Sequence, residues 1–268
     1  MGKISQEQRN LYFEKVKEYK KLIDARLAKE KSLQELLNPD EPGVSYKRIA
    51  AAEEALNVAS HYILINSVSV ALLGIKNEDY LTEARRAIAR SIKQFEDTVT
   101  SYIDAPYSDY EKNLEAISDL SPQNRYQLLM KLGFAIEELE DAYGEMSRWK
   151  WAFIELWGKF ATVAKNLLDL KSLPANLDFD SPHREVTFNH LAMVKRLFRE
   201  SADRYREKYE IFSNKAEDFR IAILFLNAIR RVHAVLGDRD DVDELKKKAD
   251  IWTTKLESDI KKKEAPKR

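Results

Sequence analysis

The apolar residues of this chain recur at spacings of three, four and seven, the period of α-helices rather than of strands. Across residues 132–170 two apolar sets follow one another in heptad register. They are Leu132, Leu139, Met146, Phe153, Phe160 and Leu167, and Ala135, Ala142, Trp149, Leu156, Val163 and Leu170. Ser121 and Pro122 form a helix start before them, since proline at the first helical position loses no hydrogen bond. The pattern predicts one continuous helix over about 122–171, roughly 75 Å long at 1.5 Å per residue.

Gly144 and Gly158 lie inside this predicted helix. Neither Gly144 nor Gly158 disturbs the heptad register, and no proline follows before residue 171. A glycine inside a helix also lets a neighbouring helix approach closely. We therefore interpret both glycines as close-packing positions rather than as turns.

A second long apolar seam follows the loop at 172–181. One heptad position holds Phe198, Tyr205, Phe212, Phe219 and Leu226, and the other holds Ala202, Tyr209, Ala216 and Ile223. Large aromatic side chains alternate here with smaller ones, as in interlocking helix pairs. The pattern predicts a continuous helix over about 182–236. Because the linker is short, we expect the two long helices to fold back antiparallel.

Shorter helices are expected around these two. Capping residues and apolar stripes place them at about 5–37, 45–74, 77–104, 107–118 and 241–263. The predicted fold is therefore an all-α, elongated helical bundle with two long antiparallel coiled-coil-like helices and about five shorter ones. We expect a single domain over 1–268, with a subdivision into a shorter-helix part, 1–120, and a long-helix part, 121–268.

The second of these helices is unusually apolar. From residue 58 to residue 75 it carries no charged side chain, a stretch of the length that a membrane span needs. His61, Asn66 and three serines argue against a span, because each polar group would need a partner in hydrocarbon. We expect a buried central helix instead.

Charge and composition exclude several classes of function. The chain has 45 basic and 45 acidic side chains, so it carries no overall field that would attract nucleic acid. It has no cysteine, which excludes disulfides and thiolate chemistry. The polar N-terminus lacks the apolar core of a secretory signal, which favours a cytoplasmic location.

Catalytic and metal-binding patterns are not found. The four histidines (His61, His183, His190 and His233) lack the helical carboxylate spacing of a ferritin-like metal site. No cluster of glycines forms a phosphate-binding loop, and no glycines flank a nucleophilic serine. We expect no catalytic residue, no metal site and no cofactor.

Tryptophans provide the first candidate contact surface. The segment 149–160, WKWAFIELWGKF, is rich in aromatic residues, and Trp151 falls on neither of its apolar faces. Exposed tryptophans are frequent anchors of protein interfaces. Trp151, Trp157 and Trp252 are therefore candidate protein-interaction residues, although a third contact within the fold is the favoured explanation for Trp151.

Basic clusters provide the second candidate surface. Arg230 and Arg231 precede the end of the second long helix, and Lys246, Lys247 and Lys248 follow in the last helix, with Lys261 to Lys263 behind them. If these residues met on one tip, they would contact phosphate or anionic lipid. Lysines near a helix end also stabilise its dipole, which is the simpler explanation.

Three stretches resemble a known group of proteins. They are LLGIKNEDYL (72–81), WGKFATVAKNLLDLK (157–171) and SADRYREKYE (201–210). With these stretches the chain resembles a group of uncharacterised all-helical proteins from spirochaete bacteria, over most of its length. The resemblance implies a helical fold and no particular activity.

The leading functional hypothesis is a non-enzymatic structural or adaptor protein that acts through protein–protein contacts or self-association. Long apolar seams and the lack of a convergent polar site favour contact over catalysis. The alternatives are a peripheral helical protein that binds a membrane surface, and a metal-binding or enzymatic helical bundle. No nucleic-acid partner is expected.

Overall fold

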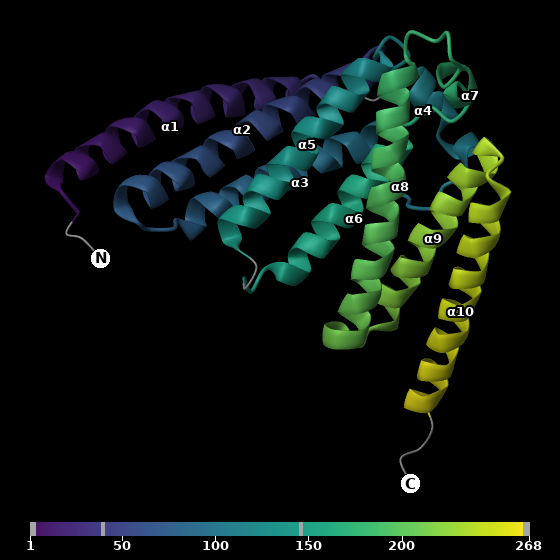
Figure 1. The fold of residues 1–268 in the computed structure, drawn as a ribbon. Coiled ribbons are helices and arrows are strands. Elements are labelled where there is room, and N and C mark those ends of the chain that lie inside the picture. The colour runs from purple at the N-terminus through teal and green to yellow at the C-terminus, as the bar shows by residue number, and fades with distance from the viewer. Residues whose placement is uncertain (1–3, 39–40, 145–146, 265–268) are drawn as a thin grey trace. The chain divides into compact units, whose positions relative to one another are not determined.

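The described chain consists of helices and turns. The computed structural model describes residues 4–38, 41–144 and 147–264, and no strand occurs in these ranges, which confirms the all-α class (Figure 1). The helices are α1 (Gln6–Glu35), α2 (Val44–Leu73), α3 (Glu78–Thr98), η1 (Tyr107–Asp109), α4 (Glu111–Glu115), α5 (Pro122–Tyr143), α6 (Lys150–Asn166), α7 (Leu173–Asn176), α8 (Arg184–Glu207), η2 (Lys208–Ser213), α9 (Ala216–Leu236) and α10 (Arg239–Glu264).

Local capping signals explain several helix ends. Ser5 forms a capping box with Gln8 at the start of α1, and Ser121 caps α5 ahead of Pro122. Each cap satisfies a backbone N–H that the helix leaves unpaired. Gly74 ends α2 in the left-handed conformation, with φ 65°, at the predicted end of this helix. α3 is shorter than expected and ends at Thr98, and the predicted helix at 107–118 is reduced to η1 and α4.

The prediction of one continuous helix over 122–171 is wrong. α5 ends at Tyr143, Gly144 has φ 79° and ψ 156°, and α6 begins only at Lys150. This backbone conformation is almost restricted to glycine, because a Cβ atom would collide with the chain. Gly144 is therefore a turn and not a close-packing position. Met146 of the predicted seam lies outside the described residues.

The interpretation of Gly158 is confirmed. A Cβ atom placed on this residue would lie 2.8 Å from Cε2 of Tyr205 and 3.3 Å from Cζ of Phe225. Both distances are shorter than normal carbon contacts. Only glycine lets α6 approach these two rings so closely.

The predicted continuous helix over 182–236 is also wrong. α8 passes into the π-helical turn η2, and Asn214 then adopts φ 50° before α9 begins at Ala216. Asparagine tolerates this left-handed conformation better than most residues. Phe212, assigned to the buried seam, is 60% exposed because it lies in the turn. α8 and α9 form a helical hairpin instead of one rod (Figure 1).

The helices pack as two compact units. Unit 1 comprises Met1–Thr100 and Asn113–Leu156, and unit 2 comprises Ser101–Lys112 and Trp157–Arg268, so α6 passes from one unit into the other. In unit 1, α2 packs against α1, α3 and α5. In unit 2, α9 packs against α8 and α10.

Aromatic rings fill the core of unit 2. Tyr209 stacks on Phe219 with ring centroids 4.9 Å apart, and Phe198 meets Phe225 edge to face at 5.2 Å. Such pairs stabilise a core beyond the burial of their surface. The pairings run in opposite order along the two helices, so α8 and α9 are antiparallel.

Candidate interaction surface on helix α2

Helix α2 lies at the centre of unit 1. Its heptad positions Ile49, Leu56 and Ile63 are 6% exposed or less, which agrees with the expected central helix. At its C-terminal end α2 is only partly covered by other helices. Val70 of the same stripe is 47% exposed, and Ile75, just beyond the helix, is 53% exposed. The first half of α2 is therefore a core element, and its second half has an open side.

The open side follows one seam of side chains. Its members are Glu53, Asn57, Ser60, Leu64, Ser67 and Ala71, which we call the α2 seam. The steps between them alternate four and three, so all six lie on one face of the helix. Ser60, Leu64, Ser67 and Ala71 are exposed, and 44% of Leu64 is accessible to solvent. No charged residue occurs between residues 55 and 75, so the distal part of the seam is uncharged.

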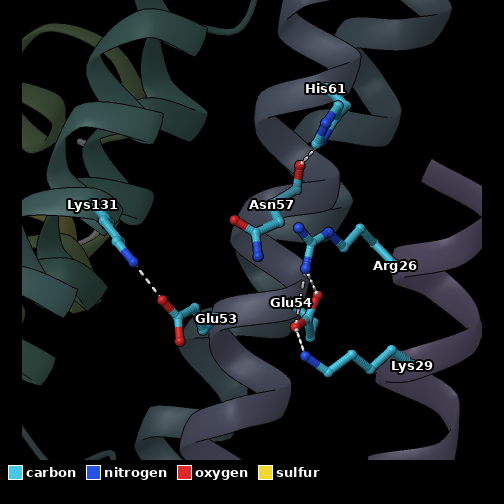
Figure 2. A network of polar contacts seen from close by, with 7 residues as sticks. All are labelled: Arg26, Lys29, Glu53, Glu54, Asn57, His61 and Lys131. Carbon is cyan, nitrogen blue, oxygen red and sulfur yellow. Dashed lines mark hydrogen bonds and ion pairs between the residues drawn. The ribbon is translucent and has the colours of Figure 1, made fainter. Parts of the chain in front are cut away.

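Ion pairs mark the proximal end of the seam. Figure 2 shows Glu53 and Glu54 directed to opposite sides of α2. Glu53 pairs with Lys131 of α5. Glu54 binds Lys29 at 2.6 Å and Arg26 at 3.1 Å, both from α1. The α2 seam therefore runs between α1, which supplies Arg26 and Lys29, and α5, which supplies Lys131. We call these two sides the α1 edge and the α5 edge.

The carboxylate of Glu54 is held in its charged form. Burial would raise its pKa, but hydrogen bonds from Lys29 and Arg26 outweigh this effect and lower the pKa below the usual value. Only 6% of the Glu54 side chain is exposed, whereas 40% of the Glu53 side chain is. A buried carboxylate shared by two cations fixes the relative position of the helices that supply them.

The hydroxyl groups of the seam are already satisfied. Ser60 donates to the carbonyl of Leu56 at 3.0 Å, and Ser67 donates to the carbonyl of Ile63 at 3.1 Å. A hydroxyl bonded to its own helix needs no further donor interaction when it is buried. The exposed parts of both side chains are small, so another helix can pack closely against them.

The α5 edge is acidic. Glu138 lies seven residues, or two turns, after Lys131 on the same side of α5, and Asp141 follows one turn later. Both are exposed, and the chain has no lysine or arginine between Lys131 and Arg148. Beside them Phe134 is 61% exposed. This edge combines an exposed aromatic ring with two exposed carboxylates.

By length and composition, α2 also meets the criteria for a membrane span. It is the one helix among the described residues that does, and 39% of its most apolar stretch is buried inside the protein. The core helix of a water-soluble bundle satisfies the same criteria. The contacts of α2 with α1, α3 and α5 are those of a bundle core.

The predicted tryptophan anchors occupy different positions. Trp252 is only 3% exposed and lies 5.7 Å from the ring of Phe219, so it is a core residue of unit 2 and not an exposed anchor. Trp151 and Trp157 are half-buried. Lys150 lies over the ring of Trp151, and Trp157 contacts Phe160 at 5.8 Å between ring centroids.

The predicted basic cluster does not form a single tip. Arg231 pairs with Asp104 at 2.6 Å, and Lys248 pairs with Asp203 at 2.9 Å. Lys263 donates to the carbonyl of Asn214, at the turn between α8 and α9. This turn precedes α9, whereas Arg231 lies near the C-terminal end of that helix. Arg230 is half-buried, and Lys246 and Lys247 are exposed on α10.

One group of potential metal ligands occurs in the described residues. His233, Asp238 and Asp241 bring one ligand atom each within 4.8 Å of one another. Sequence spacing did not identify this group, although the sequence contains acidic residues directly after Gly237. Lys195 binds Asp238 at 3.1 Å and Arg199 binds Asp241 at 2.6 Å. Both carboxylates are thus already neutralised by cations, and a divalent ion would have to displace them.

A buried lysine occupies the core of unit 2. Lys165 is 2% exposed, and its ammonium donates to the carbonyls of Ile103 and Ala105 at 3.4 and 3.3 Å. Burial lowers the pKa of Lys165 to about 8. Nearby, Tyr107 donates to Asp169 at 2.7 Å. These bonds hold the segment 103–107 against α6.

Comparison with known proteins identifies the family. The sequence matches the TP0443 family over residues 8–260. The chain belongs to the TP0443 family. This match confirms the expected resemblance to a group of helical spirochaete proteins. No curated protein and no solved structure matches the chain. The function of this TP0443-family protein must therefore be argued from its own surface.

The α2 seam is the surface feature that sequence analysis missed. The heptad Ile49, Leu56, Ile63 and Val70 lies beside the seam on α2, and its first three members are buried. The seam itself has mostly small or polar members, which apolar periodicity does not detect. Its signal was the long uncharged stretch, which exceeds what one buried face requires.

Proposed function

We propose that this TP0443-family protein is a non-enzymatic structural or adaptor protein and that the α2 seam is its contact surface. The observation that carries the proposal is the uncharged open face of α2 at Ser60, Leu64, Ser67 and Ala71. An uncharged helix face with no covering element is typical of helix-to-helix contact between proteins.

The two predicted continuous helices do not support an adaptor function, because the chain breaks at Gly144 and at Asn214. The proposed contact surface lies instead in unit 1, on the single helix α2, which packs against α1 and α5. It runs from Glu53 to Ala71 and does not involve the rest of the chain.

A membrane-surface function receives less support. Arg231 and Lys248 are ion-paired, and Lys263 lies at the other end of its unit from Arg231. Beside the α2 seam the α5 edge carries Glu138 and Asp141, which anionic lipid headgroups would repel. A protein surface with complementary charge suits this arrangement better.

Photo-crosslinking tests the proposal. A photoreactive amino acid replaces Leu64 in one variant and Ile251, a 66% exposed residue of α10, in the control. We expect protein adducts in living cells from position 64 and few from position 251. Lipid adducts alone, or equal adducts from both positions, would reject protein contact through the α2 seam.

A further inference from the structure

A cavity of about 540 Å³ opens on unit 1, on another side of α2 than the α2 seam. Three helices line it: α1 with Lys20, Ile23 and Asp24, α2 with Tyr62, and α3 with Asp79, Tyr80, Thr82, Glu83 and Arg86. Its volume falls in the range of small-molecule sites, about 300–1,000 Å³. Tyr62 lies two residues from both Ser60 and Leu64, so it projects from the side of α2 opposite the α2 seam. The cavity is therefore independent of the proposed contact surface.

Aromatic and apolar groups form one wall of this cavity. Ile23 is only 2% exposed, and Tyr62 and Tyr80 are half-buried. The two tyrosine rings stack with their centroids 6.0 Å apart and their planes inclined by 23°. The face of an aromatic ring carries partial negative charge and attracts cations. Such a wall suits a ligand that combines methylene groups with positive charge.

Carboxylates dominate the polar part of the lining. Asp24 and Asp79 are exposed, and within the described residues the side chain of neither forms an ion pair or a hydrogen bond. Glu83 binds Arg86 at 2.5 Å. With Lys20 as the second cation, the three carboxylates of the lining outnumber its two cations. The cavity therefore carries a net negative charge.

The pKa of Tyr62 is consistent with this charge. Burial raises the pKa most, and the carboxylates of Glu83 and Asp24 raise it further, while Arg90 lowers it. Arg90 is itself paired with Glu30 of α1, at 2.8 and 3.1 Å. Only 4% of the Glu30 side chain is exposed, so this pair holds α1 against α3. The walls of the cavity are thus fixed without a ligand, which lowers the entropic cost of binding one.

A cation of the protein itself already uses the aromatic wall. Lys20 places its ammonium group 5.8 Å from the centroid of the Tyr80 ring. Lys20 is an exposed residue of α1, and its side chain is long and flexible. A cation from solution can therefore take the place of this ammonium group on the ring.

The spacing of the carboxylates suits an elongated cation better than a metal ion. Asp24, Asp79 and Glu83 do not form a group of ligand atoms within 4.8 Å of one another in the described part of the chain. We propose that the cavity binds an aliphatic polyamine, whose ammonium groups pair with Asp24 and Asp79. Its methylene chain lies against the rings of Tyr62 and Tyr80. Separated carboxylates match a ligand whose charges are themselves separated by methylene groups.

Calorimetric titration of the intact chain with spermidine at low salt tests the proposal. We expect a single site with a dissociation constant below about 100 µM. Asp24→Asn and Asp79→Asn should each raise this constant at least about fivefold, because each removes a charge that faces an ammonium group. Asp119→Asn removes the same charge from an exposed position beside Tyr46, outside the cavity, and should leave the constant unchanged.

Substitution of Lys20 should have the opposite effect. We expect Lys20→Gln to lower the dissociation constant at least about threefold, because the protein's own ammonium group no longer competes for the ring of Tyr80. Lys21→Gln removes the same charge from the next residue of α1, which is exposed and does not line the cavity, and should have a smaller effect. An anionic ligand would bind more weakly to Lys20→Gln, and that result would contradict the proposal.

Two further probes separate a polyamine from other cations. Butylamine carries one ammonium group, as a lysine side chain does, and should bind at least about tenfold more weakly than spermidine. Magnesium chloride at the concentration of spermidine should not displace it. Equal binding of butylamine, displacement by magnesium, or equal effects of Asp119→Asn and Asp79→Asn would overturn the proposal. Photo-crosslinking from position 64 does not involve this cavity, so the proposed function and the polyamine site can fail separately.

Discussion

Glu53 and Glu54 are neighbours in the sequence, yet their carboxylates bind different helices. Glu53 pairs with Lys131 of α5, and Glu54 with Arg26 and Lys29 of α1 (Figure 2). Successive residues of a helix point about 100° apart, so two adjacent acids reach both flanking helices. This pair fixes α2 between α1 and α5 and thereby leaves the α2 seam facing outward.

Substitution of Glu54 tests how much the buried ion pair contributes to the free energy of unfolding. We expect Glu54→Gln to lower the free energy of unfolding by about 1–3 kcal/mol, because two cations lose a buried partner. Glu53→Gln is the matched control and is expected to cost less than about 1 kcal/mol, since its pair is exposed. Urea denaturation of both variants measures the difference. Equal losses would show that burial of Glu54 does not matter.

The pH dependence of stability follows from the same residue. The pKa of Glu54 is lowered in the folded protein, so its contribution is present above the unfolded pKa and is lost as pH falls through the folded pKa. The model-peptide value of glutamate is about 4.3. We expect the difference in stability between the native chain and Glu54→Gln to be constant near pH 7 and to shrink below about pH 4.3. A difference that grows on acidification would contradict this assignment.

Because Lys165 is buried, we expect the stability of the protein to depend on pH above about pH 8. Its pKa is lowered by burial to about 8, whereas the unfolded chain binds the proton up to about pH 10.4. The unfolded state therefore holds more protons in this window, and stability contributed by this residue rises with pH. Relative to Lys165→Met, the native chain should gain up to about 2–3 kcal/mol between pH 8 and 10, at 1.36 kcal/mol per pKa unit.

Urea denaturation at several pH values measures this gain. Lys159→Met is the control, because Lys159 is an exposed residue of the same helix. Its stability should follow that of the native chain across the window. If Lys165→Met also followed the native chain, the buried ammonium would have no measurable effect on folding.

Gly158 predicts a steric effect. We expect Gly158→Ala to lower the free energy of unfolding by about 1–3 kcal/mol, because the new methyl group would lie 2.8 Å from the ring of Tyr205. Lys159→Ala, one residue further along α6, should change stability by no more than about 0.5 kcal/mol. Thermal denaturation of both variants decides the matter, and an unchanged melting temperature for Gly158→Ala would show that α6 can shift at little cost.

Asn214 predicts a backbone effect at the turn between α8 and α9. Its φ of 50° suits glycine and asparagine, so Asn214→Gly should be nearly neutral. Asn214→Ala should lose about 1 kcal/mol, since a left-handed conformation is unfavourable for a residue with an ordinary Cβ. The contact from Lys263 goes to the backbone carbonyl of Asn214 and persists in both variants. Equal stability of the two variants would rule out backbone strain as the cause.

Local signals predicted the fold class and several helix ends correctly. The capping box at Ser5 and the left-handed Gly74 depend on nearby residues, so the sequence specifies them directly. The continuity of the long helices was wrong for a different reason. Leu139 and Phe153 lie on either side of the break, and both are buried, so the heptad pattern continues although the helix does not. Periodicity reports which residues are buried, not whether one helix carries them.

The candidate surface was harder to predict than the core. Trp252 looked like an exposed anchor, but α10 turns it toward Phe219. The α2 seam is exposed because the neighbouring helices leave it uncovered. This depends on how α1 and α5 pack against α2. Residue patterns along one helix do not contain that information.

The helical hairpin of α8 and α9 has a consequence for folding speed. Because the chain turns back at Asn214, the rings of Tyr209 and Phe219 meet across only ten residues. The next helix, α10, again packs against its immediate predecessor. Short-range pairings of this kind close small loops at low entropic cost and give a low contact order, for which folding within microseconds to milliseconds is usual. We therefore expect this hairpin to form early when unit 2 folds.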